Sequence, residues 1–248
     1  MRKNPENYRI YEAIHPISNA DQTVADYLDT LGLTVNYFDE KTILDCGYGG
    51  IGWALDLFLK SRSKKVYGID INATWIPVME NKFKELNHKL ILQNGQLLHL
   101  PYKENYFDYV HCHGVLHHIQ NWEAGLTELC RVVKSDGTLY LMVYGQYGPL
   151  GRIVNNFLRL LGKVVPFRIM SLFVDKLGFL SNHEYSILDI MYVETELHFS
   201  REMIEEALEK LNFKDIKFHK STKWARHRIM TLGILLGKNV NHIVTARK

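Results

Sequence analysis

The sequence predicts an α/β fold in which a parallel sheet is covered by helices on both faces. Three observations lead to this expectation. Short apolar runs alternate with amphipathic stretches between residues 41 and 145, two of these runs end at an acidic residue, and the alternation gives way at residue 146 to longer helical stretches. Strands that alternate with helices imply parallel strands, because each crossover helix returns the chain to the same end of the sheet.

The composition is typical of an ordinary globular chain. Its 248 residues, of which 46% are hydrophobic and 23% charged, fit one large α/β domain with an insertion or a small cap. No apolar run is long enough for a spanning helix and the N-terminus lacks the apolar core of a signal peptide, so we expect a cytoplasmic protein. The three cysteines are odd in number and widely spaced, which favours a reducing compartment over a disulfide framework.

The first half of the core alternates strands and helices. One or two helices over residues 5–38 precede it, and Gly32 stops the pattern. Each strand is a short apolar run, and each helix has apolar residues three and four positions apart. In chain order the predicted elements are a strand at 42–46, a glycine loop with a helix at 51–60, a strand at 65–70, a helix at 74–86 and a strand at 90–93.

The second half continues this alternation and then departs from it. In the core, the predicted elements are a buried strand at 106–113, an amphipathic helix at 122–133, a Lys-Ser-Asp-Gly turn at 134–137 and an apolar strand at 138–144. Helical stretches at 153–161 and 169–177 follow. The chain ends with a helix at 200–211, which has Ser200 as its N-cap, and with closing strands at 215–219 and 242–246 around a helix at 224–236. Right-handed crossovers place the tips of the parallel strands along one edge of the sheet; these tips carry Asp45, Asp70, Gln96 and His113.

Four parts of the chain follow from this order. We expect an N-terminal helical cap at 1–40, a cofactor-binding core at 41–145, a helical insertion at 146–199 that covers the substrate, and a closing helix with terminal strands at 200–248. The last 48 residues carry eleven basic and five acidic side chains. Such a basic segment is either a solvated face or an attraction for an anionic partner.

The glycine loop after the first strand limits the choice of cofactor. Gly47, Gly49 and Gly52 match the G-x-G-x-x-G pattern of dinucleotide sites. However, Asp45 lies just before the loop and no Lys or Arg occurs between residues 47 and 59, which disfavours a pyrophosphate. S-adenosylmethionine is cationic and carries no phosphate, and Asp70 at the second strand tip suits its ribose hydroxyls.

Four segments, in order and suitably spaced, resemble the class I S-adenosylmethionine-dependent methyltransferases, most closely the small-molecule branch with quinone and sterol methyltransferases. They are Ile-Leu-Asp-Cys-Gly-Tyr-Gly-Gly, Tyr-Gly-Ile-Asp, the stretch from Leu-Pro-Tyr to Gly-Val-Leu-His-His-Ile, and Glu-Leu-Cys-Arg-Val-Val-Lys-Ser-Asp-Gly-Thr-Leu-Tyr-Leu. The resemblance covers about residues 40–145. It implies a Rossmann-like, seven-stranded, doubly wound sheet and a methyl transfer by direct displacement that releases S-adenosylhomocysteine.

The resemblance also implies roles for cofactor-binding residues. The methionine part would be held by Asp45 and by the backbone of Gly47 and Gly49, and Asp70 would bind both ribose hydroxyls. The remaining contacts would come from Ile71 against the adenine, Gln96 at the adenine amino group in place of the usual acid, the backbone of Leu97 at an adenine ring nitrogen, and His113 at the methionine end. The third glycine of the family's loop falls on Ile51, unless Gly50 or Gly52 replaces it through a shifted turn.

Histidines cluster after the fourth strand, and two interpretations of His117 and His118 stay open. Either one acts as a general base for the methyl acceptor, or one caps the helix that begins near Asn121 while the other packs. We predict no metal site here. His111 and His113 point to one face of a strand and Cys112 points to the other, which splits the potential ligands.

Substrate contacts are expected from the segments outside the core. The candidates are Tyr11 and His15 on the N-terminal helix, Tyr144 after the fifth strand, and Tyr185 and Tyr192 in the insertion. The apolar run at 172–180, with Arg168 before it and Lys176 within it, predicts a buried lid helix, with a helix on a membrane surface as the alternative. The expected substrate is a small, apolar or aromatic molecule, and no nucleic acid is expected.

Three other functions remain as alternatives. A nicotinamide-dependent oxidoreductase would need a phosphate-friendly loop and a catalytic pair such as Tyr-x-x-x-Lys. An RNA or other macromolecule methyltransferase is compatible with the basic C-terminal segment, but no Asn-Pro-Pro-Tyr-type motif follows the fourth strand. A non-catalytic protein that binds S-adenosylmethionine would be consistent with Gln96 and the altered glycine loop.

Overall fold

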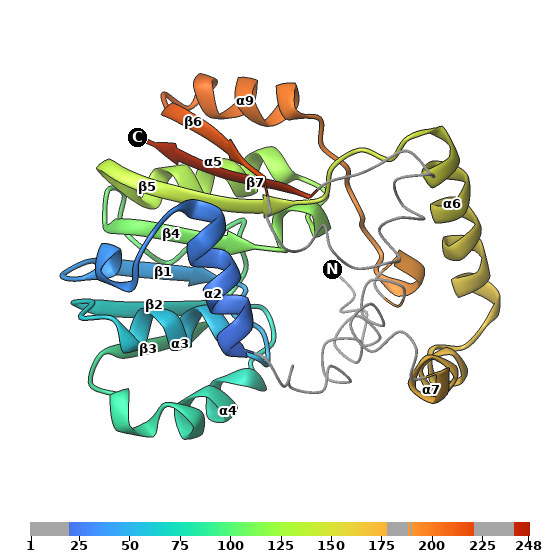
Figure 1. Ribbon diagram of the computed structural model, residues 1–248, viewed down its shortest axis with the longest axis horizontal. Helices are drawn as coiled ribbons and strands as arrows, with labels where there is room; N and C mark the ends of the chain where they lie inside the picture. The colour runs from blue at the N-terminus through green and yellow to red at the C-terminus, as the bar shows by residue number, and fades with distance from the viewer. Residues whose placement is uncertain (1–19, 178–187, 189, 221–240) are drawn as a thin grey trace.

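The protein is built around one seven-stranded sheet, which a computed structural model describes together with its helices over residues 20–177, 188, 190–220 and 241–248 (Figure 1). The order across the sheet is β3-β2-β1-β4-β5-β7-β6. The strands are β1 (Thr42–Cys46), β2 (Lys65–Asp70), β3 (Leu90–Asn94), β4 (Phe107–His113), β5 (Val133–Val143), β6 (Lys214–His219) and β7 (His242–Arg247). Strands β1 to β5 pair in parallel, whereas β7 runs antiparallel to β5 and β6. The predicted seven-stranded α/β fold is confirmed.

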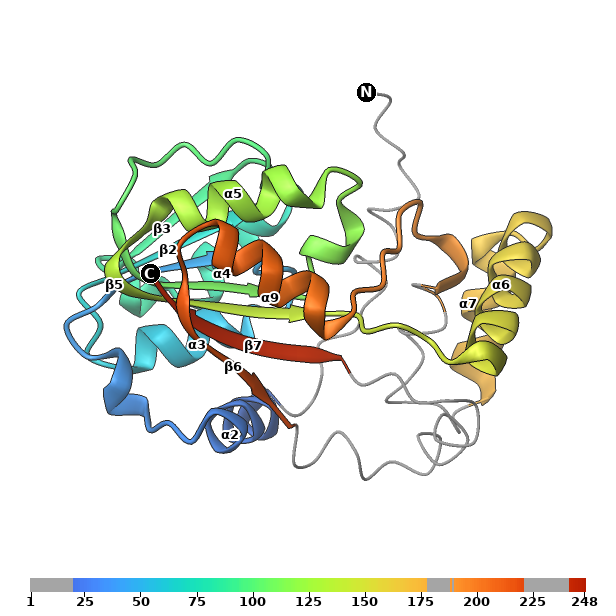
Figure 2. The same ribbon diagram turned by 90° about the horizontal axis from the view of Figure 1, so that it is seen from above.

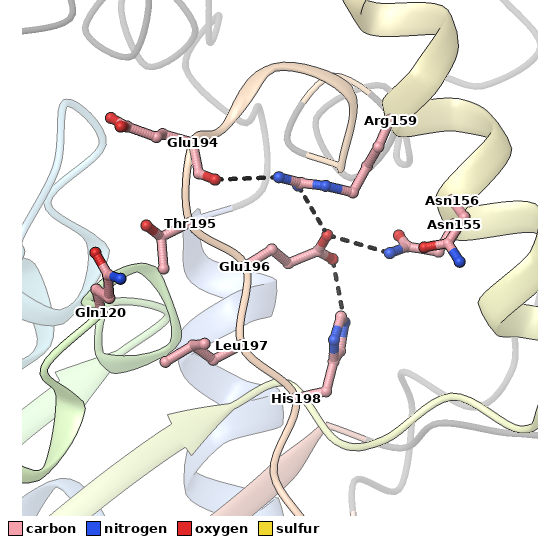
Figure 3. Close-up of a pocket in the computed structure, with 9 residues that line it drawn as sticks. All are labelled: Gln120, Asn155, Asn156, Arg159, Glu194, Thr195, Glu196, Leu197 and His198. Atoms are coloured by element: carbon pink, nitrogen blue, oxygen red, sulfur yellow. Dashed lines mark hydrogen bonds and ion pairs between the residues drawn. The ribbon is translucent and has the colours of Figure 1, made fainter.

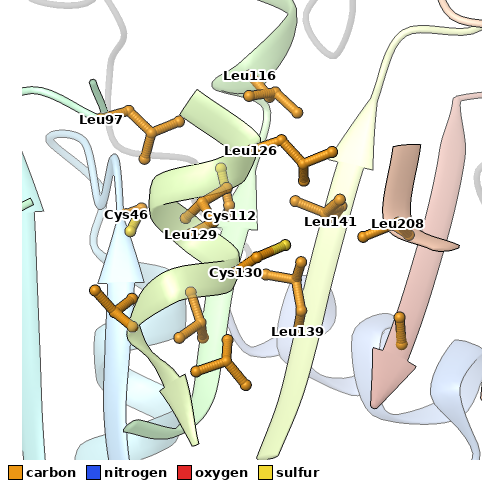
Figure 4. Packing of buried hydrophobic residues seen from close by; sticks show 14 of the residues in the cluster. Cys46, Leu97, Cys112, Leu116, Leu126, Leu129, Cys130, Leu139, Leu141 and Leu208 are labelled. Atoms are coloured by element: carbon orange, nitrogen blue, oxygen red, sulfur yellow. The ribbon is translucent and has the colours of Figure 1, made fainter. Parts of the chain in front are cut away.

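Helices cover both faces of this sheet (Figure 2). One face packs against α2 (Ala20–Leu31), α3 (Trp53–Lys60) and α4 (Trp75–Lys82), and the other packs against α5 (Trp122–Val132) and α9 (Arg201–Lys210). Side chains alternate along the strands, so the sheet has one hydrophobic core on each face. Ile43 packs in the first core, on the side of α2, α3 and α4, and Leu44 packs in the second core, on the side of α5 and α9. Figure 4 shows the second core, where leucines of α5 meet Cys46, Cys112 and Leu139 of the sheet.

The carboxyl ends of the parallel strands form one edge of the sheet, and three further elements lie beyond that edge. A short 3₁₀ turn, η3 (Leu116–His118), follows β4. Helices α6 (Pro149–Val164) and α7 (Phe167–Leu177) follow β5 and stand away from the sheet in both ribbon views. An isolated bridge between Gly145 and Phe199 returns the chain from this helical insertion to the edge of the sheet.

Most predicted boundaries agree with the structure within two residues, but the turn predicted at 134–137 is wrong. Strand β5 begins at Val133, and its register against β4 shifts over these residues. Asp136 takes a positive φ of 65°, and its N–H donates to the carbonyl of Lys248. The turn-forming residues therefore build an irregularity inside a strand. The helix predicted at 224–236 lies outside the described residues.

Candidate active site

The glycine loop between β1 and α3 adopts a conformation that depends on three of its glycines. Gly47, Gly49 and Gly52 have φ angles of 77°, 58° and 59°, a region that residues with a side chain rarely adopt. The N–H of Gly47 donates to the carbonyl of Ile69 in β2 (2.7 Å), which fixes the loop across the strand tips. Gly52 is the residue before α3, so the third special position of the loop is Gly52 and not Ile51.

Asp70 at the tip of β2 joins this loop to the neighbouring turn. Its Oδ2 accepts from the N–H of Gly49 (2.9 Å), and its Oδ1 accepts from the N–H of Asn72 (2.8 Å). Burial raises the pKa of the Asp70 carboxyl, and the backbone hydrogen bonds oppose that increase. Each carboxylate oxygen has a second lone pair, so Asp70 can still accept from ligand hydroxyls.

The residues that follow Asp70 prepare an apolar surface beside it. Ile71 is 60% exposed, although it comes directly after a buried strand. The side-chain amide of Asn94, at the tip of β3, donates to the carbonyls of Asp70 (3.0 Å) and Ile71 (2.8 Å) and so holds this turn in place. Beyond β3, Gln96 is exposed, and Leu97 is buried in the core beneath α5. An acid, an exposed apolar side chain and an amide thus follow one another along the edge.

Asp45 has a partner that sequence reasoning missed. Its side chain is almost completely buried, and its Oδ1 accepts a hydrogen bond from Nδ1 of His111 (2.7 Å). The two residues are direct neighbours in the parallel register of β1 and β4. Only the strand order shows that β1 lies beside β4, and this explains why the sequence alone did not indicate the pair. The assignment of Asp45 to a methionine group stays a prediction.

His113, at the tip of β4, contacts two aromatic side chains. A hydrogen bond joins its Nδ1 to the hydroxyl of Tyr140 (3.0 Å), and its ring lies 5.3 Å from that of Trp53. Burial, with a smaller contribution from His111, lowers the pKa of His113 to about 3. His111 and His113 lie on the same face of the strand, as predicted, and their rings stack. Within the described residues, no group of three or more His, Cys, Asp or Glu side chains could hold a metal ion.

We predict that His113 makes the protein less stable at acidic pH. A histidine in an unfolded chain has a pKa near 6.5, so lowering the pH favours the unfolded state from about pH 6.5 downwards, until the folded pKa is reached. At pH 5 the free energy of unfolding should be about 2 kcal/mol lower than at pH 7 through His113 alone. Urea unfolding at both pH values measures this loss. A His113→Gln variant should lose less stability between them, and an equal loss would contradict the prediction.

His117 and His118 in η3 have different surroundings. His117 is completely buried and stacks on Tyr144 with ring centroids 3.6 Å apart. Burial, and next the neighbouring His118, lower its pKa well below the ordinary value, so it is a weak base. His118 donates from Nδ1 to the carbonyl of Thr195 (3.0 Å), which leaves the lone pair on Nε2. Neither caps α5, because the side chain of Asn121 accepts from the N–H of Ala124.

The predicted substrate residues do not all come together. Tyr144 lies against His117 at the strand edge, whereas the hydroxyl of Tyr192 donates to the carbonyl of Val165 beside α6. Tyr11, His15 and Tyr185 lie outside the described residues. Tyr144 is therefore the described member of this group that lies at the predicted active site.

A pocket of about 510 Å³ lies between α6 and the segment 194–198 (Figure 3). It is lined by Gln120, Asn155, Asn156, Arg159, Glu194, Thr195, Glu196, Leu197 and His198. The carboxylate of Glu196 is almost fully buried; its Oε2 accepts from Arg159 (3.2 Å) and Asn155 (3.5 Å), and its Oε1 lies 3.2 Å from His198. Glu194 and His198 fall within the predicted insertion at 146–199, but no periodicity indicated that α6 turns polar residues towards them.

The pocket is connected to the histidine turn by the backbone. The carbonyl of Thr195 accepts from His118, and the N–H of Leu197 donates to the carbonyl of His117 (2.8 Å). The ring of His198 lies 4.5 Å from that of Tyr147, which follows β5. The insertion is thus fastened to the edge of the sheet at the turn that carries the two predicted catalytic histidines.

Comparisons with known proteins agree with this architecture. Residues 44–141 match the family described as a methyltransferase domain. A demethylmenaquinone methyltransferase from Oceanobacillus iheyensis is 29% identical over 132 residues, which are 52% of this chain and 55% of that protein. The chain therefore spans about half the length of the first curated relatives it matches.

Solved structures share the fold at low sequence identity. Phosphoethanolamine N-methyltransferase 2 from Haemonchus contortus, in complex with S-adenosyl-L-methionine, has a TM-score of 0.61 at 16% identity and covers 92% of this chain and 52% of its own. An S-adenosylmethionine-dependent methyltransferase from Mesorhizobium loti has a TM-score of 0.61 at 12% identity, covering 90% of this chain and 98% of its own. These likenesses establish the fold alone.

Proposed function

We propose that the chain belongs to the class I S-adenosylmethionine-dependent methyltransferases and that it uses S-adenosylmethionine to methylate a small-molecule acceptor; its similarity to a methyltransferase domain over residues 44–141 supports this. The observation that carries the proposal is the position of Asp70. It is buried at the tip of β2, holds the glycine loop through Gly49, and retains acceptor capacity for ribose hydroxyls.

The residues around Asp70 fit this cofactor better than a dinucleotide. A Cβ added to Gly49 would meet nothing within 4 Å, so there is open space in front of the loop. The carboxylate of Asp70 is bonded to the N–H of Gly49 beside that space, Asp45 lies at the end of β1 just before the loop, and no Lys or Arg occurs between residues 47 and 59. This arrangement favours a cation and disfavours a pyrophosphate.

Each part of the cofactor would have its own contacts. Asp70 would hold the ribose, and the backbone of Gly47 and Gly49, with Asp45 beneath, would hold the methionine part. The exposed Ile71 would cover one face of the adenine. The remaining predicted contacts are Gln96 and Leu97 at the adenine edge and His113 near the methionine end. When bound, the cofactor supplies a methyl group on a sulfonium, which an acceptor displaces directly.

The acceptor side would lie at the histidine turn and the pocket fastened to it. The curated relative named above is called a demethylmenaquinone methyltransferase, and a pocket of about 510 Å³ lies in the volume range typical of sites for small molecules. The insertion would exclude water, and the side chains of the turn would orient the acceptor for in-line attack. His118 would take the acceptor's proton, because its lone pair is on Nε2.

We predict that His118→Gln lowers kcat by about a hundredfold or more, the range typical of a lost general base. Affinity for S-adenosylhomocysteine should not change, since the substitution lies outside the cofactor contacts. Steady-state kinetics and calorimetry measure the two quantities. His99→Gln, an exposed histidine in the β3–β4 connection, is the matched control and should keep full activity. Full activity of His118→Gln would remove the general base from the mechanism.

The destination of the methyl group tests the proposed function. The protein is incubated with S-adenosylmethionine carrying a labelled methyl group and, in parallel, with a solvent extract of bacterial cells, total RNA and total protein. Label in the solvent-extractable fraction is the expected result. Label in RNA or protein would assign a macromolecular acceptor. Tight cofactor binding without any transfer would favour a non-catalytic binding protein.

A further inference from the structure

Helix α6 lies on the protein with its apolar face turned outward. Leu150, Ile153, Val154, Phe157, Leu160 and Val164 are between 37% and 76% exposed. Their spacing of three and four positions places them on one side of the helix. An amphipathic helix of a globular protein normally buries this side, so the orientation of α6 is reversed.

The inward side of α6 explains why it is held this way. A Cβ on Gly162 would lie 2.2 Å from the carbonyl oxygen of Met191, so the helix backbone approaches the segment after residue 190 closely. Arg159 donates to the carbonyls of Ile190 (3.2 Å) and Glu194 (3.1 Å) and pairs with Glu196. Polar and small residues thus make the internal contacts, and the outward orientation is fixed by several directed interactions.

Helix α7 adds to the exposed apolar surface. Ile169, Leu172 and Phe173 are each about 60% exposed, so the prediction of a buried lid helix is wrong for Leu172 and Phe173. We call the nine side chains on both helices the α6–α7 apolar surface; they are Leu150, Ile153, Val154, Phe157, Leu160, Val164, Ile169, Leu172 and Phe173. An exposed apolar surface made by nine side chains is typical of an interaction site.

The charges around this surface favour an anionic membrane over a second copy of the chain as its binding partner. Residues 137–177, which include both helices, contain five basic residues and a single acid, Asp175. Arg159 points inward, whereas Arg152, Lys163 and Arg168 are exposed. A symmetric pairing of two copies through this surface would bring like charges together. An anionic lipid surface would instead attract them while its interior receives the apolar side chains.

We propose that the α6–α7 apolar surface, together with Arg152, Lys163 and Arg168, binds the protein to the surface of an anionic membrane. The helices lie in the plane of the interface, with the apolar side chains inserted at the boundary between headgroups and acyl chains and the basic side chains at the phosphates. Among the described helices, none is both long and apolar enough to cross a membrane. Membrane binding through this surface does not require the methyl transfer proposed above.

Sedimentation with lipid vesicles tests the proposal on the full chain. The wild-type protein should sediment with vesicles of phosphatidylcholine and phosphatidylglycerol in equal parts, and much less with phosphatidylcholine alone. Phe157→Ser combined with Leu160→Ser should weaken partitioning on the order of tenfold or more, since two exposed apolar side chains are lost. Lys163→Glu combined with Arg168→Glu should remove the preference for the anionic vesicles.

A matched control and a second measurement separate the outcomes. Val78→Ser removes an exposed apolar side chain of α4 and should leave vesicle binding unchanged. Thermal melting of every variant checks the fold. Absence of vesicle binding by the wild-type protein, or binding that Phe157→Ser with Leu160→Ser does not weaken, would overturn the proposal. A wild-type dimer that this double variant dissociates, seen by analytical ultracentrifugation without lipid, would assign the surface to a second copy.

Discussion

Replacing Asp70 with alanine is expected to reduce the affinity for S-adenosylmethionine by a hundredfold or more. The carboxylate would bind both ribose hydroxyls, and each hydrogen bond to a charged group contributes about 1.5–3 kcal/mol. The same change also frees the N–H groups of Gly49 and Asn72, which Asp70 accepts from in the structure. The loop that would receive the methionine part loses its anchor. Isothermal titration calorimetry measures the affinity.

Asp108→Ala is the matched control for this experiment. Asp108 likewise accepts from a backbone N–H, that of Thr42 (2.8 Å), and it pairs with Lys134 (2.8 Å) at the opposite end of the sheet. Its loss should lower the melting temperature without changing the affinity for the cofactor. If Asp70→Ala bound S-adenosylmethionine as tightly as the wild-type protein, the ribose assignment would be wrong. Equal losses of affinity in both variants would mean that Asp70 acts only through stability.

Gly47→Ala should be strongly destabilising. Gly47 has a φ of 77°, and a Cβ built there would lie 2.3 Å from Cγ2 of Val115. The left-handed conformation costs about 1–2 kcal/mol with a side chain, and overpacking costs about 1–3 kcal/mol more. We therefore expect the free energy of unfolding to fall by about 2–5 kcal/mol. Urea unfolding followed by circular dichroism measures it.

Gly49→Ala separates the conformational cost from the steric one. Gly49 also has a positive φ, of 58°, but no atom lies within 4 Å of an added Cβ. Its substitution should cost only about 1–2 kcal/mol of stability. It should nevertheless weaken cofactor binding, because the new methyl group would occupy the open space in front of the loop. Equal stability losses at Gly47 and Gly49 would show that the contact with Val115 is easily relieved.

Much of the core could be predicted from local pattern. Strands β1 and β2 begin and end at the predicted residues, since each is a short apolar run between a turn and a polar tip. Ser200 caps α9 as expected, accepting from the N–H of Met203. The acid at the tip of β2 and the glycines before α3 could be located because both are local features of the chain.

The parts that could not be predicted depend on contacts between distant residues. Asp45 and His111 can pair only because β1 lies beside β4, and the spacing of residues in the sequence does not indicate this strand order. The contacts of Glu196 with Asn155 and Arg159 require α6 to face the segment 194–198 with its polar side. Hydrophobic periodicity predicts the opposite orientation, because it assumes that an apolar face is buried. Helix α6 departs from this rule because its apolar face is exposed and its polar side makes the internal contacts.

The central claim is that the edge of the sheet around Asp70 binds S-adenosylmethionine. Calorimetric titration of the full chain with S-adenosylhomocysteine, and separately with NAD and NADH, tests it most directly. We predict saturable binding of one S-adenosylhomocysteine per chain, lost in Asp70→Ala, and no binding of either nicotinamide cofactor. Binding of NAD or NADH in place of S-adenosylhomocysteine, or no binding of any of the three, would contradict the claim.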